Sequence, residues 1–155
     1  MSTGTPEQRL ASAGFELPAA PAPVAAYVPA VIAGGFAYVS GQVPFVDGKL
    51  AFTGRVGESV SLEDGVRCAE ICALNGLAVL RGAIGELGRV ERIVKLGVFV
   101  ASGEAFADHP KVANGASELM VTAFGEAGRH ARAAVGCSSL PLGVPVEVEM
   151  VVAVA

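Results

Sequence analysis

Two segments near the C-terminus of the chain carry residues whose types and spacing suit chemistry. Residues 130–136 read His-Ala-Arg-Ala-Ala-Val-Gly, and strand alternation separates Arg132 from the valine that follows it. Residues 146–150 read Val-Glu-Val-Glu-Met, so that Glu147 and Glu149 share the face opposite the apolar residues. The two segments therefore predict strands, each with one polar face.

The pairing of these strands decides which polar groups meet. Matching apolar face to apolar face across a short connection predicts an antiparallel pair, with Arg132 opposite Glu149 and Ala134 opposite Glu147. One face of the sheet would then carry the arginine and both glutamates. His130 is expected at the edge of this cluster.

Two interpretations of the cluster are open. In the first, Arg132 and Glu149 form an ordinary cross-strand ion pair on a solvated sheet face, worth about 0.2–1 kcal/mol. In the second, the planar guanidinium of Arg132 binds a substrate carboxylate in bidentate fashion. Glu147, offset along the strand, would then hold and activate a water molecule as a general base. A small 2-oxo or 2-imino acid would fit between the two side chains.

Periodicity in the rest of the chain predicts the elements that position these groups. Helical spacing of apolar residues predicts one helix capped by Ser61 and another that begins after Asp108 and ends at Gly125. Asn114 and Ser117 on the second helix are expected to face solvent. Around these helices we expect an irregular arm over 1–30, a strand over 36–40, a hairpin over 43–52 with an Asp-Gly turn, and strands over 94–100, 131–137 and 146–154.

This order, β-β-α-β-α-β-β, indicates a single α+β domain over residues 1–155. Its sheet is expected to be mixed, with two helices packed on one face. A hydrophobic content of 52% against 17% charged residues excludes a disordered chain. The same apolar surplus predicts that part of the surface is covered by another copy of the chain.

Charge and targeting signals exclude further classes. A net charge of −4 argues against nucleic acid and anionic membranes as partners, because affinity for both comes from clustered positive charge. No segment has the roughly 18–20 uninterrupted apolar residues of a membrane-spanning helix, and the N-terminus lacks a basic start followed by an apolar core. We therefore expect a cytoplasmic protein with no membrane partner.

The metal-binding side chains are few. Cys68, Cys72 and Cys137 match no common zinc or redox spacing and are expected to be reduced thiols. His109 and His130 cannot form a three-ligand zinc site without carboxylates. We expect neither a metal nor a cofactor.

Several short motifs, in order along the chain, resemble the Rid/YjgF family of reactive-intermediate deaminases. They are Tyr27-Val-Pro, Tyr38-Val-Ser-Gly-Gln42-Val-Pro, Arg132-x-x-Val, Leu140-Pro141 and Val146-Glu-Val-Glu149. The resemblance implies a chorismate-mutase-like fold, a homotrimer with a site in each cleft between subunits, and no cofactor. It also implies hydrolysis of 2-iminoacids such as 2-iminobutanoate and 2-iminopropanoate to the oxo acid and ammonia.

Residue by residue, the resemblance places Arg132 at the family's carboxylate-binding arginine and Glu147 at the acidic residue that positions water. Tyr27, Ser40 and Gly41 fall at positions that line the cleft. Ala134 departs from the cysteine of the best-known deaminases, which puts the substrate range in question. That departure and the sequence Thr-Gly-Arg-Val-Gly around Arg55 indicate a subgroup of the family distinct from the best-known deaminases.

Two flanking residues have open roles. Arg55 lies in a Gly-flanked loop, where it is either a lid residue or simply exposed. His130 is either a residue at the edge of the site or the start of a strand.

Two other functions stay open. A non-enzymatic trimer could bind a small metabolite and regulate a partner, since a site this simple also suits binding alone. Endoribonuclease or translation-inhibitor activity is attributed to some relatives, but the acidic charge and only nine aromatic residues (7 Phe, 2 Tyr, no Trp) argue against strong RNA binding.

Overall fold

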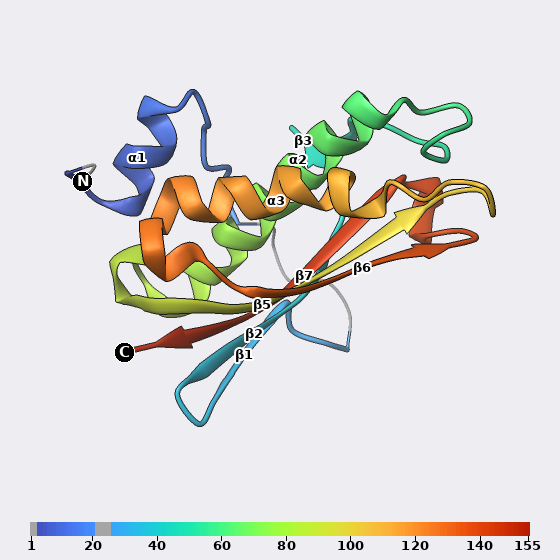
Figure 1. Ribbon diagram of the computed structural model, residues 1–155. Coiled ribbons are helices and arrows are strands. Elements are labelled where there is room, and N and C mark those ends of the chain that lie inside the picture. Colours follow the sequence, from blue (N-terminus) through green and yellow to red (C-terminus); the bar gives the residue numbers. More distant parts are fainter. Residues whose placement is uncertain (1–2, 21–25) are drawn as a thin grey trace.

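The computed structural model describes residues 3–20 and 26–155, in which a five-stranded sheet has the order β1-β2-β7-β5-β6. Helices lie on one side of the sheet, and the other side is open (Figure 1). The helices are α1 (Pro6–Ser12), α2 (Leu62–Ile84) and α3 (His109–Phe124). The strands are β1 (Ala30–Ala33), β2 (Phe36–Gln42), β5 (Val90–Ala101), β6 (Ala131–Cys137) and β7 (Val146–Val154). A separate small sheet consists of β3 (Phe45–Val46) and β4 (Lys49–Leu50).

The expected α+β class is confirmed, with a mixed sheet in which β5 and β6 run parallel and the other pairs antiparallel. Along the chain the main sheet and the two long helices follow the expected β-β-α-β-α-β-β order. The first strand of that order is β1, which the sequence analysis did not predict and of which only Ala30 belongs to the expected arm. The Asp-Gly hairpin forms where expected, but as the separate β3–β4 sheet.

The ends of the two long helices follow local chemistry. The Ser61 hydroxyl accepts a hydrogen bond from the Asp64 amide at 3.1 Å and so satisfies one of the free donors of the first turn of α2. Asp108 precedes α3, and Pro110 lies in its first turn, where its missing N–H costs nothing. Gly125 ends α3 with a φ of 59°, a left-handed conformation that glycine adopts without strain.

The expected irregular arm over residues 1–30 is wrong for its first part, which forms α1. Thr5 and Gln8 make a reciprocal capping box: the Thr5 hydroxyl accepts from the Gln8 amide and the Gln8 side chain accepts from the Thr5 amide. The buried Leu10 anchors this short helix to the core. Two of the prolines on which the expectation rested, Pro21 and Pro23, lie outside the described residues.

The expected pairing of the last two strands is also wrong. β5 lies between them, parallel to β6 and antiparallel to β7. The physical reason is that α3 connects β5 to β6, and a strand–helix–strand unit closes as a parallel pair. β5 carries the fully buried Leu96, Val98 and Val100 and is paired along both edges, while the more exposed β6 forms an edge of the sheet.

The core lies between the sheet and the two long helices. Val148, Met150 and Val152 of β7 are buried on this side, and α2 crosses α3 closely, with the Gly115 position against the backbone carbonyl of Val66. None of the helices in the described ranges is long and apolar enough to cross a bilayer.

The cysteines carry free thiols, two of them in the core. Burial, mainly, raises the pKa of Cys68 to about 12, so this thiol stays protonated at neutral pH. The finding agrees with the expectation of reduced, packed thiols.

Candidate functional site

Arg132 projects from the edge strand β6 toward α3. Its register partner in β5 is the buried Leu96, so its side chain lies on the helix-covered side of the sheet. One terminal nitrogen, Nη1, donates to Asn114 Oδ1 at 2.9 Å and to Ser117 Oγ at 3.1 Å. Both partners are neutral, and within the described residues Arg132 forms no ion pair with an acidic side chain. Its positive charge is therefore available to an anion.

This guanidinium borders a pocket of about 500 Å³ between β6 and α3. The pocket is lined by Ser117, Glu118, Val121, Thr122, Arg129, His130 and Arg132. Its charged lining residues include Arg132, which has no acidic partner in the described part of the chain, Glu118, and Arg129, which forms an ion pair with Glu126 at 3.0 Å. The unpaired arginine favours a small anionic ligand. Because β6 is a sheet edge, the pocket also lies where a second molecule can approach.

His130 is tied into the same group. Its Nδ1 lies 2.6 Å from the carbonyl oxygen of Gly128, and its Nε2 lies 2.9 Å from Ser117 Oγ. Burial lowers the pKa of His130, the Arg132 charge lowers it further, and the Gly128 carbonyl acts in the opposite direction. The imidazole is therefore held neutral beside the arginine, at the site edge where the sequence analysis placed it as one of two possibilities.

Glu147 lies on the open side of the sheet, beside β2. It is half-buried, and desolvation, followed by the charge of Glu149, raises its pKa. Gly41 leaves the space that its carboxylate occupies: a Cβ at that position would lie 2.1 Å from Glu147 Oε1. A carboxylate with a raised pKa is suited to exchanging a proton with water near neutral pH.

The expected cluster of Arg132 with the two glutamates does not form within one chain. Arg132 and Ala134 pair with Leu96 and Val98 of β5, whereas Glu149 and Glu147 pair with Gly97 and Phe99. Alternate residues of β5 face opposite sides, so the arginine and the glutamates lie on opposite faces of the sheet. Arg132 is not opposite Glu149, and Ala134 is not opposite Glu147.

The other residues named in the sequence analysis divide between these faces. Ala134 packs against the core on the Arg132 side. Ser40 precedes Gly41 on the open side, where it lines a pocket of about 370 Å³ together with Glu149 and Lys95. Tyr27 is 64% exposed before β1. The candidate residues therefore fall into two groups, called candidate half-sites below, one around Arg132 and one around Glu147.

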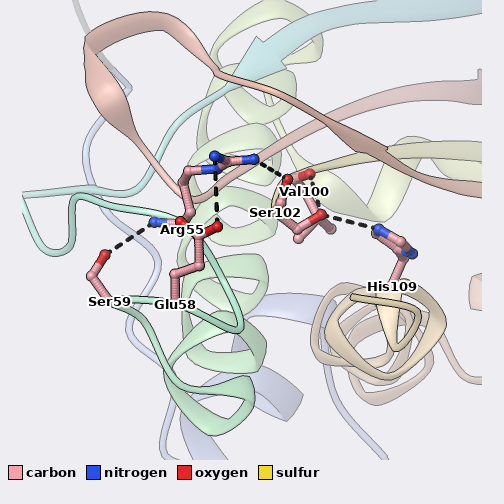
Figure 2. Close-up of polar contacts among 6 residues, drawn as sticks. All are labelled: Arg55, Glu58, Ser59, Val100, Ser102 and His109. Atoms are coloured by element: carbon pink, nitrogen blue, oxygen red, sulfur yellow. Dashed lines mark hydrogen bonds and ion pairs between the residues drawn. The ribbon is translucent and has the colours of Figure 1, made fainter. Parts of the chain in front are cut away.

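Arg55 is placed apart from both candidate half-sites. Figure 2 shows its guanidinium reaching the backbone carbonyl of Ser102, and Ser102 Oγ lies 3.1 Å from His109 Nε2. Glu58 lies 3.6 Å from Arg55 Nη1. The side chain joins its loop to the end of β5 and is still 39% exposed.

Asn114 and Ser117 have contacts that the sequence analysis did not predict. Both were expected to face solvent: Asn114 is exposed as expected, although its Oδ1 accepts a hydrogen bond from Arg132, whereas Ser117 is half-buried and also bonds to Arg132. Their three-residue spacing on a helix otherwise rich in Ala, Gly and Val places them on one face. That spacing was the available signal, but the partner strand was not known to lie beside α3.

The sequence and the fold of this chain were compared with those of known proteins. Residues 7–153 match the model of the family described as "YjgF/chorismate_mutase-like, putative endoribonuclease". Protein TCP17 of Trypanosoma cruzi is 44% identical over 98% of this chain and 96% of its own length.

Two solved structures have nearly the same fold. The protein Atu1372 of Agrobacterium tumefaciens, of unknown function, is 47% identical with a TM-score of 0.92, over 97% of this chain and 92% of the other. A protein of Shewanella oneidensis named as a "putative endoribonuclease" is 36% identical with a TM-score of 0.93, over 97% of this chain and all (100%) of the other. Since the family model spans nearly the whole chain and these likenesses run from end to end, the protein belongs to the YjgF/chorismate-mutase-like family, the Rid/YjgF family that its motifs resemble.

Proposed function

We propose that this protein hydrolyses small 2-iminoacids to 2-oxoacids and ammonia at a site shared between two copies of the chain. Arg132 of one copy binds the substrate carboxylate, and Glu147 of the other positions the attacking water. The observation that carries the proposal is the unpaired charge of Arg132, held by neutral oxygens beside a pocket of about 500 Å³. Such a group is built for a small carboxylate.

The reaction needs little else from the protein. Water adds to the electrophilic imine carbon and loses a proton to Glu147, whose raised pKa suits it to accept that proton. Glu147 returns this proton to the nitrogen of the carbinolamine. As the C–N bond then breaks, the hydroxyl proton passes to Glu147 and the C=O bond forms. One water is consumed, and one ammonia and one 2-oxoacid are released. Carboxylate binding holds the substrate in the site, and a directed water supplies the acceleration by orientation.

The opposite placement of the two candidate half-sites is the reason for a second copy. Within one chain the sheet separates Arg132 from Glu147, so neither can complete the site of the other. The open sheet face exposes Val31, Tyr38 and Val135 by 45–50%, apolar area that a second copy would cover. We propose a homotrimer, and light scattering on the purified protein would test it.

The experiment that tests the function measures the hydrolysis of an imine produced in the assay. An amino-acid oxidase supplied with 2-aminobutanoate generates the imine, and oxo-acid formation is measured with and without the protein. Replacing Arg132 with Ala should lower kcat/KM by at least about tenfold, since a hydrogen bond to a charged group contributes about 1.5–3 kcal/mol. Replacing the exposed Arg67 of α2 with Ala is the matched control and should leave activity unchanged. An unaltered imine decay, or full activity without Arg132, would refute the proposal.

One observation favours binding without turnover as a second candidate. A single chain has the proposed carboxylate-binding Arg132 on one face of the sheet and the candidate base Glu147 on the other. A protein that does not assemble across these faces would therefore bind a 2-oxoacid and release it unchanged. Calorimetry with 2-oxobutanoate distinguishes the two, because this candidate predicts Arg132-dependent binding with no effect on imine decay.

A further inference from the structure

Three polar side chains at the junction of β6 and α3 form one hydrogen-bonded series. His130 Nε2 lies 2.9 Å from Ser117 Oγ, and Ser117 Oγ lies 3.1 Å from Arg132 Nη1. The series begins at the backbone carbonyl of Gly128, 2.6 Å from His130 Nδ1. Each contact has a proton whose position can be assigned.

The assignment starts from the carbonyl oxygen of Gly128, which can only accept. His130 Nδ1 must therefore carry the hydrogen, and in the neutral imidazole Nε2 is left as an acceptor. Ser117 has one hydroxyl hydrogen, and it is donated to His130 Nε2. Burial lowers the pKa of His130 and keeps this neutral form in place.

The lone pairs of Ser117 Oγ are then free to accept a hydrogen bond from Arg132. Nη1 carries two hydrogens, of which one is donated to Ser117 Oγ and the other to Asn114 Oδ1. Donation from Ser117 to the imidazole makes its oxygen a better acceptor for the guanidinium, since hydrogen bonds in series polarise one another. Both hydrogens of Nη1 are thus bonded to α3.

The remaining edge of the guanidinium consists of Nε–H and Nη2–H. These two parallel donors form the fork that matches a carboxylate in bidentate geometry. Because Asn114 and Ser117 lie on one face of a long helix, they also fix the plane of the fork relative to the pocket. A free arginine side chain would lose this orientation to rotamer freedom.

We propose that Ser117 and His130 are positioning residues, which hold Arg132 so that its Nε–Nη2 edge faces the substrate carboxylate. The inference rests on the proposed function, because it takes the ligand of Arg132 to be a carboxylate. It adds two residues outside the motifs that led to Arg132, one from α3 and one that precedes β6.

Binding and kinetics test the positioning role with a conservative pair of variants. Ser117→Ala should raise the Kd for 2-oxobutanoate and the KM for the imine roughly tenfold, because a misaligned fork loses part of a charge-assisted hydrogen bond. The value of kcat should change less than about twofold, since the carboxylate is bound equally in the ground state and the transition state. Ser117→Thr keeps the hydroxyl and should restore both constants, and His130→Ala should resemble Ser117→Ala.

A spectroscopic measurement tests the proton assignment without substrate. The chain has only two histidines, so a His109→Gln variant assigns the long-range ¹H–¹⁵N imidazole spectrum. We expect His130 as the Nδ1–H tautomer, with its Nε2 resonance shifted in Ser117→Ala. The Nε2–H tautomer would overturn the series.

The two proposals fail in different ways. A wild-type protein that binds 2-oxobutanoate while Ser117→Ala binds it equally well would overturn the positioning role alone. A wild-type protein that neither binds 2-oxobutanoate nor accelerates imine hydrolysis would overturn the proposed function, and the carboxylate role of this series with it. Circular dichroism of each variant shows that a changed Kd does not come from unfolding.

Discussion

The close approach of Gly41 to Glu147 makes a prediction that does not depend on the function. A Cβ at position 41 would lie 2.1 Å from Oε1, 2.7 Å from Cδ and 2.9 Å from Cγ of Glu147. All three distances are shorter than van der Waals contact, and the φ of Gly41 is outside the left-handed region. Gly41→Ala therefore introduces a clash with one side chain and no backbone strain.

The magnitude follows from overpacking. Moving the whole Glu147 side chain should cost about 1–3 kcal/mol in the free energy of unfolding. In a Glu147→Ala background the three clashing atoms are absent, and Gly41→Ala should cost less than about 0.5 kcal/mol. The double-mutant cycle then gives a coupling energy of about 1–2 kcal/mol between the two positions.

Urea denaturation at pH 7 measures these values. The chain has no tryptophan, so unfolding is followed by far-ultraviolet circular dichroism at one fixed protein concentration, because self-association would make stability depend on concentration. If the two single substitutions add within about 0.5 kcal/mol, the sites are independent and the contact described here is wrong. Since the clash displaces the candidate base, Gly41→Ala should also lower kcat for imine hydrolysis.

Three further predictions concern stability. Gly115→Ala should lower the free energy of unfolding by about 2–3 kcal/mol, since its Cβ would lie 2.3 Å from the backbone oxygen of Val66 and push α2 away from α3. The control Gly88→Ala, with nothing within 4 Å of its Cβ, should change it by less than about 0.5 kcal/mol. Equal urea midpoints for the two variants would contradict the helix crossing. Ser61→Ala should cost about 1 kcal/mol by loss of the cap of α2, and an unchanged midpoint would show that the cap contributes nothing. The raised pKa of Glu147 contributes stability that is present below the ordinary value of 4.5 and is lost as the pH rises through the folded-state pKa. Glu147→Gln should therefore melt higher than the wild type at pH 7 and equally at about pH 4; a lower melting temperature at pH 7 would contradict the assigned direction.

Local signals predicted most of the elements. The caps at Ser61 and Gly125 lie where the sequence predicted them, because a helix end is decided by a few neighbouring residues. The strands over 131–137 and 146–154 have the expected bounds. The helix α1 was not predicted, because the expectation of an irregular arm rested on its prolines and did not use the capping box of Thr5 and Gln8.

The residues named for the site remain a prediction, whereas the arrangement expected for them within one chain is wrong. Arg132 and Glu147 were identified by type and by resemblance, and both occupy environments that suit their proposed roles. Their placement on one face was wrong, since it rested on a strand pairing inferred from a short connection. The bonds of Asn114 and Ser117 to Arg132 were missed for the same reason: Arg132 is 15–18 residues away in the sequence and comes beside them only when β6 pairs with β5.

The sequence by itself determined the class of fold, the start of α2, the bounds of α3 and of the last two strands, and the family, because these depend on periodicity, capping and motifs that are local in the chain. Only the tertiary structure decided which side of the sheet each charged residue faces. Strand order is set by which long-range pairing buries the most apolar surface, and here that pairing gives β5 the central position and β6 the edge. Because β6 has β5 and not β7 as its neighbour, Arg132 is separated from Glu147 and lies against Ser117 and His130.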